Sequence, residues 1–241
     1  MVYALVTAGG RGRRFGGPVP KQYADLAGVP VVVRTLRAFD ACPAVDRLVL
    51  VVPAGDEPWV RQSLIARAGL AKPLGIAAGG VSRQESVFAG LCAIGEEDGL
   101  VAIHDAVRPL VTLRCIEACI AAARETGAAI AAVPLRDTLK KTGPGAAAIA
   151  ATIAREGLWL AQTPQVFRLG LIRAAHEEAR RLGLTATDDA ALVERRGATV
   201  RIVEGSPFNF KITTVADLEL AAAVLGRGLP PPGGGRKGEH A

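Results

Sequence analysis

The sequence predicts an α/β fold with a doubly wound, mostly parallel central sheet. Short apolar runs alternate with helix-like stretches along most of the 241 residues. Several of these runs are apolar throughout, which is typical of strands buried on both faces of a parallel sheet. A regular alternation of strand and helix places helices on both faces of such a sheet.

Composition indicates a sizeable hydrophobic core and argues against nucleic acid as a partner. Hydrophobic residues make up 50% of the chain, enough for one large domain or two small ones. We expect a single domain over 1–226 and a disordered tail over 227–241, where three prolines and three glycines follow one another. The net charge of +6 comes from scattered cations rather than from a run, so nucleic acid is not an expected partner.

Neither the cysteines nor the apolar runs suggest a secreted or membrane protein. Cys42, Cys92, Cys115 and Cys119 lack the spacing of a metal site, and we expect them to be buried free thiols in a reducing cytoplasm. No apolar run reaches the roughly 18 residues that a membrane span needs, and no signal peptide precedes the first run. We therefore expect a cytoplasmic protein without a membrane partner.

The first half of the chain supplies the predicted parallel strands and the helices between them. Pro30 fits the first position of a helix over 31–39. Ser82 and Glu85 have the spacing of a capping box, which begins a helix that runs to about residue 94. Thr112 can cap a helix over 113–125. Strands are expected over 2–7, 47–52, 74–78, 100–104 and 128–133.

The alternation breaks after residue 133 and predicts a β-arm over about 134–156. Residues 134–142 look extended, 143–145 (Gly-Pro-Gly) favour a turn, and 147–154 can return as a second strand. A projecting hairpin has little core of its own and is most stable against the arm of a second copy, which predicts a homodimer. A hairpin that stays free on the surface is the alternative.

The pattern of the main domain resumes after the arm. Thr187 can cap one helix, with two acids in its first turn, and Thr214 can cap the last helix. Strands are expected over 158–163 and 199–204, and helices over 169–182, 188–195 and 215–225.

A loop rich in glycine and arginine, Ala8 to Lys21, follows the first predicted strand. It holds five glycines and three arginines. Glycine lets the backbone approach a ligand closely, and arginine presents a fork of donors that fits phosphate. The loop therefore predicts a site for a polyphosphate.

Two common nucleotide-binding loops do not match these residues. A Walker loop needs lysine after its last glycine, but Pro18 stands there. A dinucleotide fingerprint needs a third glycine where Phe15 stands, which argues against an NAD-type oxidoreductase.

The residues Ala8-Gly9-Gly10-x-Gly12-x-Arg14 resemble the nucleotidyltransferases that activate sugars and polyols with nucleoside triphosphates. Within that group the chain resembles the 2-C-methyl-D-erythritol 4-phosphate cytidylyltransferase family of the non-mevalonate isoprenoid pathway. The resemblance spans about 2–225 and implies a Rossmann-like nucleotidyltransferase fold. It continues, in the family's order, through Pro20-Lys21-Gln22-Tyr23, Gly79-Gly80 with Arg83 and Ser86, His104-Asp105-Ala106-Val107-Arg108-Pro109, Arg136-Asp137-Thr138, Thr163-Pro164-Gln165, Thr187-Asp188 and Lys211.

The resemblance implies transfer of CMP from CTP to 2-C-methyl-D-erythritol 4-phosphate, with pyrophosphate leaving. It implies catalytic cations at Arg14, Lys21 and Lys211, which stabilise the charge that builds on the reacting phosphates. It also implies that Asp105 holds magnesium or another divalent cation, because one carboxylate plus substrate phosphates suffices for this ion. Some relatives are fused to a cyclodiphosphate synthase, and we expect this chain to carry the transferase alone.

The resemblance divides the remaining site residues between two substrates. His104 is expected to be structural, because the reaction needs no strong general base. Val81 stands where many relatives carry an acid, which affects base selectivity only if a side chain makes that contact. CTP would contact Ala8, Gly9, Gly10, Gly12, Gly79, Gly80, Ser86, Asp105 and Ala106. The acceptor would contact Arg108, Arg136, Thr138, Arg155, Thr163 and Thr187, with Thr138 and Arg155 reaching the site of the other subunit from the arm.

Two alternatives differ in substrate or in class. A cytidylyltransferase for ribitol 5-phosphate or another polyol phosphate would share the fold, the CTP loop and the arm. A catalytically inactive nucleotide sensor would have lost residues such as Arg14, Lys21 or Asp105, and all three are present.

Overall fold

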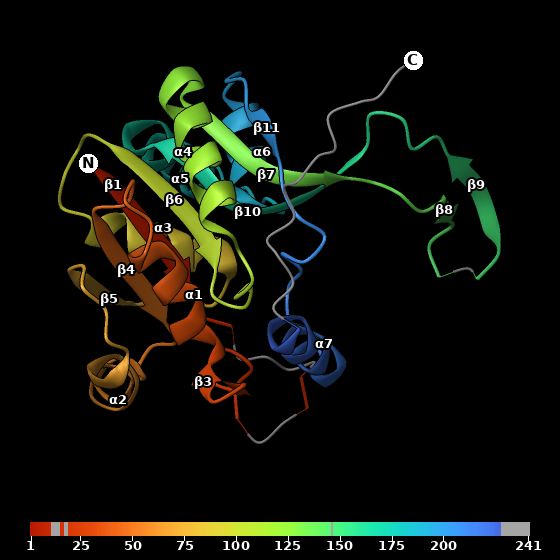
Figure 1. The fold of residues 1–241 in the computed structure, drawn as a ribbon. Coiled ribbons are helices and arrows are strands. Elements are labelled where there is room, and N and C mark those ends of the chain that lie inside the picture. The colour runs from red at the N-terminus through yellow and green to blue at the C-terminus, as the bar shows by residue number, and fades with distance from the viewer. Residues whose placement is uncertain (11–14, 17–18, 146, 228–241) are drawn as a thin grey trace, which may run out of the picture.

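The computed structural model describes residues 1–10, 15–16, 19–145 and 147–227. In this part of the chain the largest sheet has seven strands in the order β11-β7-β10-β6-β1-β4-β5 (Figure 1). β10 runs antiparallel to both neighbours, and the other neighbouring strands are parallel, as predicted. The strands are β1 (Val2–Thr7), β4 (Arg47–Val52), β5 (Leu74–Ala78), β6 (Leu100–Asp105), β7 (Ala128–Pro134), β10 (Trp159–Arg168) and β11 (Arg201–Glu204).

The first five predicted strands lie where the sequence placed them. β1, β4 and β5 have the predicted bounds, and β6 and β7 each extend one residue further. β10 is longer than the strand predicted over 158–163, because Val166 and Phe167 continue the pairing with both β6 and β7. β11 begins at Arg201 rather than at residue 199.

The predicted helices are present, and most of their caps are confirmed. Ser82, Thr112 and Thr214 each accept a hydrogen bond from a backbone N–H in the first turn of their helix. Between β4 and β5 lies a helical segment that was not predicted, made of α2 (Glu57–Trp59), the π-helix η1 (Val60–Leu64) and the 3-10 helix η2 (Ile65–Arg67). The other helices are α1 (Val31–Asp40), α3 (Arg83–Ala93), α4 (Leu113–Thr126), α5 (Leu169–Arg181), α6 (Asp189–Arg195) and α7 (Val215–Gly226).

Two residues predicted to begin helices were misplaced by one position, although α1 itself begins at Val31 as predicted. Pro30 lies just before α1 with an extended backbone, in the short strand β3 (Val29–Pro30) that pairs with β2 (Asp25–Leu26). Asp188 rather than Thr187 caps α6, because its Oδ1 accepts from the Ala191 N–H at 3.1 Å. A cap side chain reaches the second or third residue of its helix, and Asp188 has that spacing.

Alternate residues of the central strands face opposite layers of helices. Ala4 and Val6 of β1 pack with α1 and α4, whereas Tyr3 and Leu5 pack with α3, α5 and α6. This alternation follows from the two-residue period of a strand and confirms the doubly wound fold. A third apolar cluster joins α7 to the segment that leads into α1.

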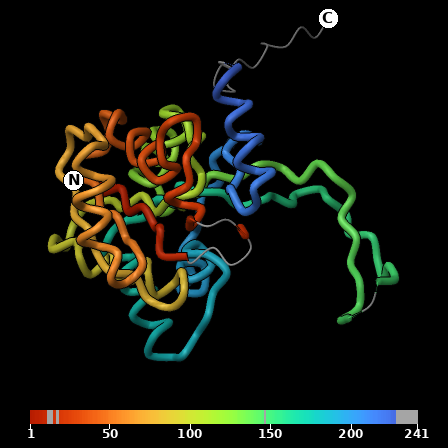
Figure 2. The backbone as a smooth tube through the Cα atoms, turned by 90° about the horizontal axis from the view of Figure 1, so that it is seen from below, coloured from red at the N-terminus to blue at the C-terminus, as the bar shows by residue number. Residues whose placement is uncertain are grey.

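The predicted arm is present and projects from the rest of the chain. β8 (Leu139–Thr142) and β9 (Ile149–Ile153) pair antiparallel, and Figures 1 and 2 show them standing clear of the large sheet. Leu139 is 40% exposed and Ile149 is 62% exposed. The arm therefore exists without a core of its own, and its packing on a second copy stays a prediction.

The cysteine prediction was correct for three of four residues. Cys42, Cys115 and Cys119 are buried free thiols, but Cys92 is exposed. Cys92 lies near the end of α3, on a side of the helix that does not face the sheet. Among the described residues, no helix is long and apolar enough to cross a membrane.

Candidate active site

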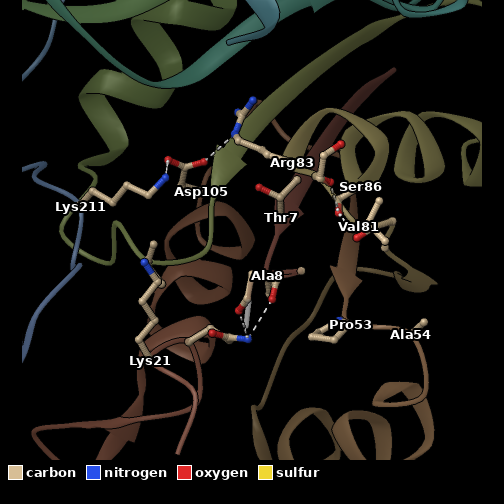
Figure 3. Close-up of a pocket in the computed structure, with 17 residues that line it drawn as sticks. Thr7, Ala8, Lys21, Pro53, Ala54, Val81, Arg83, Ser86, Asp105 and Lys211 are labelled. Atoms are coloured by element: carbon tan, nitrogen blue, oxygen red, sulfur yellow. Dashed lines mark hydrogen bonds and ion pairs between the residues drawn. The ribbon is translucent and has the colours of Figure 1, made fainter. Parts of the chain in front are cut away.

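A pocket of about 760 Å³ opens at the carboxyl ends of β1, β4, β5 and β6 (Figure 3). Open α/β sheets bind their ligands at this edge, because the loops that leave parallel strands converge there. The pocket is lined by Thr7, Ala8, Gly9, Gly10, Lys21, Gln22, Pro53, Ala54, Gly79, Gly80, Val81, Ser82, Arg83, Ser86, Asp105, Val107 and Lys211. Most of the residues predicted to bind CTP, and two of the three predicted catalytic cations, therefore share one cavity.

Ser86 explains why glycine stands at two points of the pocket wall. A Cβ on either Gly9 or Gly79 would lie 2.8 Å from the Ser86 Oγ. That hydroxyl donates to the carbonyl oxygen of Ser82 at 2.9 Å, which holds it between the two glycines. The first turn of α3 thus packs directly against both glycine-containing loops.

Gln22 holds the start of the glycine-rich loop. Its Nε2 donates to the carbonyl oxygens of Ala8 and Gly10, both at 3.0 Å. The neighbouring Lys21 lines the pocket, and Figure 3 shows its side chain extending toward Lys211. The predicted Gly12 and Arg14 lie outside the described residues.

Three cations surround the carboxylate of Asp105 at the end of β6. Its Oδ1 lies 3.1 Å from Arg83 Nε, and its Oδ2 lies 2.9 Å from Lys211 Nζ and 3.4 Å from Arg108 Nε. Burial alone would raise the pKa of Asp105, but Arg83, Lys211 and Arg108 together hold that pKa well below its usual range. Asp105 is therefore ionised at neutral pH and stands next to the predicted catalytic Lys211.

His104 belongs to a hydrogen-bond chain behind the pocket. It is fully buried, and burial lowers its pKa to about 3, so the imidazole is neutral at pH 7. Its Nε2 lies 3.2 Å from the Arg108 carbonyl and must donate to it, which leaves Nδ1 to accept from the Thr163 hydroxyl at 3.0 Å. The same hydroxyl accepts from the Asp105 N–H at 3.1 Å. These bonds fix the end of β6 and agree with the structural role expected for His104.

Lys211 comes from the loop between β11 and α7, which polar side chains hold against β10. Asn209 Nδ2 donates to the Thr163 carbonyl at 2.7 Å and to Gln162 Oε1 at 3.2 Å. Arg108 Nη1 donates to the Asn209 carbonyl at 2.8 Å. The loop thereby places Lys211 beside a carboxylate that lies 106 residues earlier in the sequence.

The predicted acceptor residues lie in three places. Arg108 and Thr163 contact Asp105 from behind the pocket, whereas Thr187 is exposed just before the cap of α6. Arg136, Thr138 and Arg155 belong to the segment that forms the arm, and none of these three lines the pocket of this chain. Arg155 instead donates to the carbonyl oxygen of Arg136.

Ala106, predicted to contact CTP, lies behind the pocket rather than in its wall. It is fully buried, and its N–H donates to the Thr7 carbonyl at 3.0 Å. Its carbonyl accepts from the Thr35 hydroxyl at 2.7 Å. These two bonds join the ends of β1 and β6 to α1, so Ala106 supports the strand that ends in Asp105.

Sequence reasoning did not assign roles to two charged residues that the fold brings to this site. Arg83 lines the pocket, and its Nη1 lies 2.8 Å from the buried Asp189 Oδ2. Burial lowers the pKa of Arg83, but the Asp189 and Asp105 carboxylates outweigh it and raise that pKa above its usual value. Both residues stand in the first turn of a predicted helix, but only the tertiary structure shows that the two helices meet.

Asp105 fits a divalent cation that is shared with phosphates. No group of three or more His, Cys, Asp or Glu residues in the described ranges could hold an ion without help. Magnesium accepts one or two carboxylates and completes its shell with substrate phosphates and water. The two Asp105 oxygens can accept about four bonds, and Arg83, Lys211 and Arg108 take three of them. One lone-pair position of the ionised carboxylate thus remains at the pocket wall, where it could bind a metal ion.

Comparisons with known proteins give the same family over nearly the whole chain. The family model described as 2-C-methyl-D-erythritol 4-phosphate cytidylyltransferase (IspD) matches residues 2–227. A protein of that name from Geobacter metallireducens is 48% identical over 233 residues, which cover 95% of this chain and 99% of that protein. A bifunctional IspD/IspF enzyme from Desulforudis audaxviator is 50% identical over 225 residues, and this chain spans only 57% of its length.

A solved structure has the same fold. The crystal structure of 4-diphosphocytidyl-2C-methyl-D-erythritol synthase from Anaerococcus prevotii superposes with a TM-score of 0.81 at 29% sequence identity. The match covers 94% of this chain and 98% of that one.

Proposed function

The chain belongs to the 2-C-methyl-D-erythritol 4-phosphate cytidylyltransferase family, and on that basis we propose how its pocket performs the family's reaction. The enzyme transfers CMP from CTP to 2-C-methyl-D-erythritol 4-phosphate and releases pyrophosphate. The product is 4-diphosphocytidyl-2-C-methyl-D-erythritol, an isoprenoid precursor. The observation that carries the proposal is the meeting of Lys21, Lys211 and an ionised Asp105 in one pocket.

CTP binds along the glycine-lined wall in this proposal. The backbone at Ala8, Gly9, Gly79 and Gly80, together with the Ser86 hydroxyl, recognises cytosine, and the glycine-rich loop that follows holds the phosphates. Val81 is fully exposed at the edge of the pocket. Because valine is aliphatic, its side chain offers no polar group to the base. Base selection therefore rests on backbone donors and acceptors, which glycine leaves open to close approach.

The reaction is a displacement at phosphorus. An oxygen of the acceptor phosphate attacks the α-phosphorus of CTP, a new P–O bond forms, and the bond to the departing pyrophosphate breaks. The attacking oxygen is already anionic, so the site needs to position two polyanions and stabilise their charge rather than remove a proton. We assign that stabilisation to Lys21, Lys211 and Arg14.

Magnesium, or another divalent cation, would bind to Asp105 together with phosphate oxygens. It would neutralise phosphate charge in the pocket. Asp105 supplies a carboxylate that stays ionised because Arg83, Lys211 and Arg108 surround it. His104 holds the strand end that carries Asp105, and both of its ring nitrogens already have partners, so it takes no proton in the reaction.

The acceptor binds beside CTP in this proposal, contacted by Arg108 and Thr187 from its own chain. Thr163, predicted to contact the acceptor, is buried and its hydroxyl bonds His104 and the Asp105 N–H, so we assign it to the support of the strand end instead. We assign Arg136, Thr138 and Arg155 to the acceptor site as well, with the arm reaching the pocket of a second copy in a homodimer. Exposed apolar side chains on the arm and just beyond it support this pairing. Leu139 and Ile149 of the arm, and Leu158, Trp159 and Leu160 where the chain returns to the large sheet, are each 36–62% exposed. Four free thiols fit a reducing cytoplasm, the compartment that we propose.

The test is an acceptor comparison. The protein is incubated with CTP, magnesium and either 2-C-methyl-D-erythritol 4-phosphate or ribitol 5-phosphate, and released pyrophosphate is measured. We expect turnover with the first acceptor. Turnover with ribitol 5-phosphate alone would favour the alternative polyol substrate, and no pyrophosphate with either acceptor would overturn the proposal.

A further inference from the structure

Behind the pocket lies a buried carboxylate, Asp189, that the proposed reaction does not use. It is the first residue of α6 and is 1% exposed. A buried charge is costly unless it is paired. The Asp189 Oδ1 accepts from His176 Nε2 at 3.1 Å, and Oδ2 lies 2.8 Å from Arg83 Nη1. His176 is itself fully buried on α5, so Asp189 is fixed from two sides.

Arg83 connects this carboxylate to the pocket. Its Nε donates to Asp105 Oδ1 at 3.1 Å, while Nη1 faces Asp189. One planar guanidinium therefore bridges two carboxylates, one at the end of β6 and one at the start of α6. Figure 3 shows the side chain reaching from α3 toward Asp105. Since both ends of the fork are engaged, the orientation of Asp105 is linked to that of Asp189.

Asp189 also balances the charge of Arg83. Arg83, Arg108 and Lys211 all lie within 3.4 Å of Asp105, so three cations face one carboxylate there. A divalent cation at Asp105 would be repelled by an arginine that has no second anion. Asp189 supplies that anion from outside the pocket, because it is not among the residues that line it.

We infer that Arg83 and Asp189 are positioning residues for Asp105, which hold its carboxylate ready for a divalent cation bound with the CTP phosphates. Asp189 acts through Arg83, and His176 orients Asp189. The inference rests on the proposed function, because it takes Asp105 as the ligand of that cation.

The first test replaces Asp189 with asparagine, which keeps the shape and removes the charge. Binding of Mn²⁺ in the presence of CTP is measured by titration calorimetry, without acceptor and therefore without turnover. We expect the Mn²⁺ dissociation constant of Asp189→Asn to rise about tenfold, the loss typical when a residue that orients a metal ligand is changed. The magnesium concentration for half-maximal turnover should rise in parallel, and the rate at saturating magnesium should fall less.

A matched control removes a different carboxylate from α5 and α6, the two helices that carry His176 and Asp189. Glu178 on α5 pairs with Arg196, which directly follows α6, and both side chains are more than a third exposed. Glu178→Gln should therefore leave Mn²⁺ binding unchanged. An equal shift in this control would show that loosening the two helices is enough, and would overturn the inference.

A second variant keeps the test decisive if Asp189→Asn does not fold. Arg83→Lys retains the positive charge but cannot bridge both carboxylates, so Mn²⁺ binding should again weaken. Unchanged Mn²⁺ binding in both variants would overturn the inference, as would a shift in Arg83→Lys with a folded Asp189→Asn that binds normally. A wild-type protein that releases no pyrophosphate would instead overturn the proposed function, while calorimetry would still report on Arg83 and Asp189.

Discussion

The pocket and the arm differ in how far a single chain surrounds their residues with contacts. At the pocket, the single carboxylate of Asp105 has ion pairs with three cations of the same chain, Arg83, Arg108 and Lys211, and His104 behind it is fully buried. On the arm, every residue of β8 and all but the last residue of β9 are exposed. Both regions carry residues assigned to the same reaction. The difference shows that the pocket is formed within one chain, whereas the arm has no core of its own in that chain. In the proposed dimer, the second copy would supply the surface that the arm packs on.

The reason lies in topology. Parallel strands bring their carboxyl ends to one edge, so residues that are far apart in the sequence meet there within a single chain. A two-stranded hairpin is marginal in water unless it packs on something else. Substitutions in the pocket should therefore act within one chain, whereas substitutions in the arm should act through a second copy.

The pocket should lose catalysis without losing its fold when Lys21 is replaced. We expect Lys21→Ala to lower the turnover rate by about 10²–10³-fold, the effect of removing one group that stabilises transition-state charge. Thermal unfolding should stay close to that of the wild type, because Lys21 lines an open cavity. Turnover near the wild-type value would contradict the catalytic role of Lys21.

The arm should affect the acceptor and not CTP. Loss of the Arg155 guanidinium should raise the acceptor KM by about 10- to 100-fold, the worth of one hydrogen bond to a charged group, and leave the KM for CTP unchanged. Steady-state kinetics of Arg155→Ala with each substrate varied in turn measures this. A change in the CTP constant alone would contradict the assignment.

Mixing Lys21→Ala with Arg155→Ala, assayed at an acceptor concentration far below the raised KM of Arg155→Ala so that each variant alone shows little turnover, tests whether the arm serves the other subunit. A dimer of one Lys21→Ala and one Arg155→Ala chain would keep one intact site, which pairs the unaltered pocket with the unaltered arm. An equal mixture that exchanges subunits should recover about a quarter of wild-type activity, since half the dimers are mixed and each has one good site of two. No recovery after demonstrated exchange would place each arm at its own pocket.

The apolar side chains of the arm should hold the dimer together. Ile149→Ser should weaken self-association by about tenfold or more, as expected from losing the burial of one large aliphatic side chain. Sedimentation over a range of concentrations measures the effect. Ile202→Ser is the matched control, because Ile202 is 43% exposed on β11 and lies outside the arm. Equal effects of the two substitutions would contradict a role specific to the arm.

Low pH should destabilise the folded chain because His104 is buried in its neutral form. Its pKa is about 3 in the folded chain against an ordinary value of 6.5, so the unfolded chain binds a proton more readily. The free energy of unfolding should therefore fall as the pH drops from about 6.5 to about 3, and this contribution should be fully present above 6.5. Urea unfolding at several pH values measures the slope, and His104→Gln should flatten it. An unchanged slope in that variant would assign the acid sensitivity to other groups.

Local sequence patterns were sufficient for most of the fold. The bounds of β1, β4 and β5 follow from apolar runs that strands buried on both faces require. Ser82 and Thr214 marked helix starts because a capping side chain acts within one turn. Pro30 precedes the first residue of α1 rather than being that residue, and Asp188 rather than Thr187 caps α6. Both differences are of one position, a scale at which neighbouring residues compete to begin a helix.

The candidate site was predicted partly from local patterns and partly from resemblance. The glycine-rich loop indicated phosphate by itself, and Asp105 followed a recognisable strand. Lys211 stood in no local pattern, and only the resemblance singled it out. The extended run over 134–142 and the Gly-Pro-Gly turn over 143–145 predicted an arm, but neither pattern indicates what the arm contacts.

The sequence by itself determined the alternation of strands and helices, the glycine-rich loop and the existence of the arm, because each depends on residues that are neighbours along the chain. Only the tertiary structure decided that Lys211, Arg83 and Arg108 share Asp105, and that Asp189 and His176 stand behind Arg83. Those contacts join residues 3 to 106 positions apart and depend on how the sheet orders its strands. Charge pairing acts through space, so it becomes readable only once the fold has set the distances.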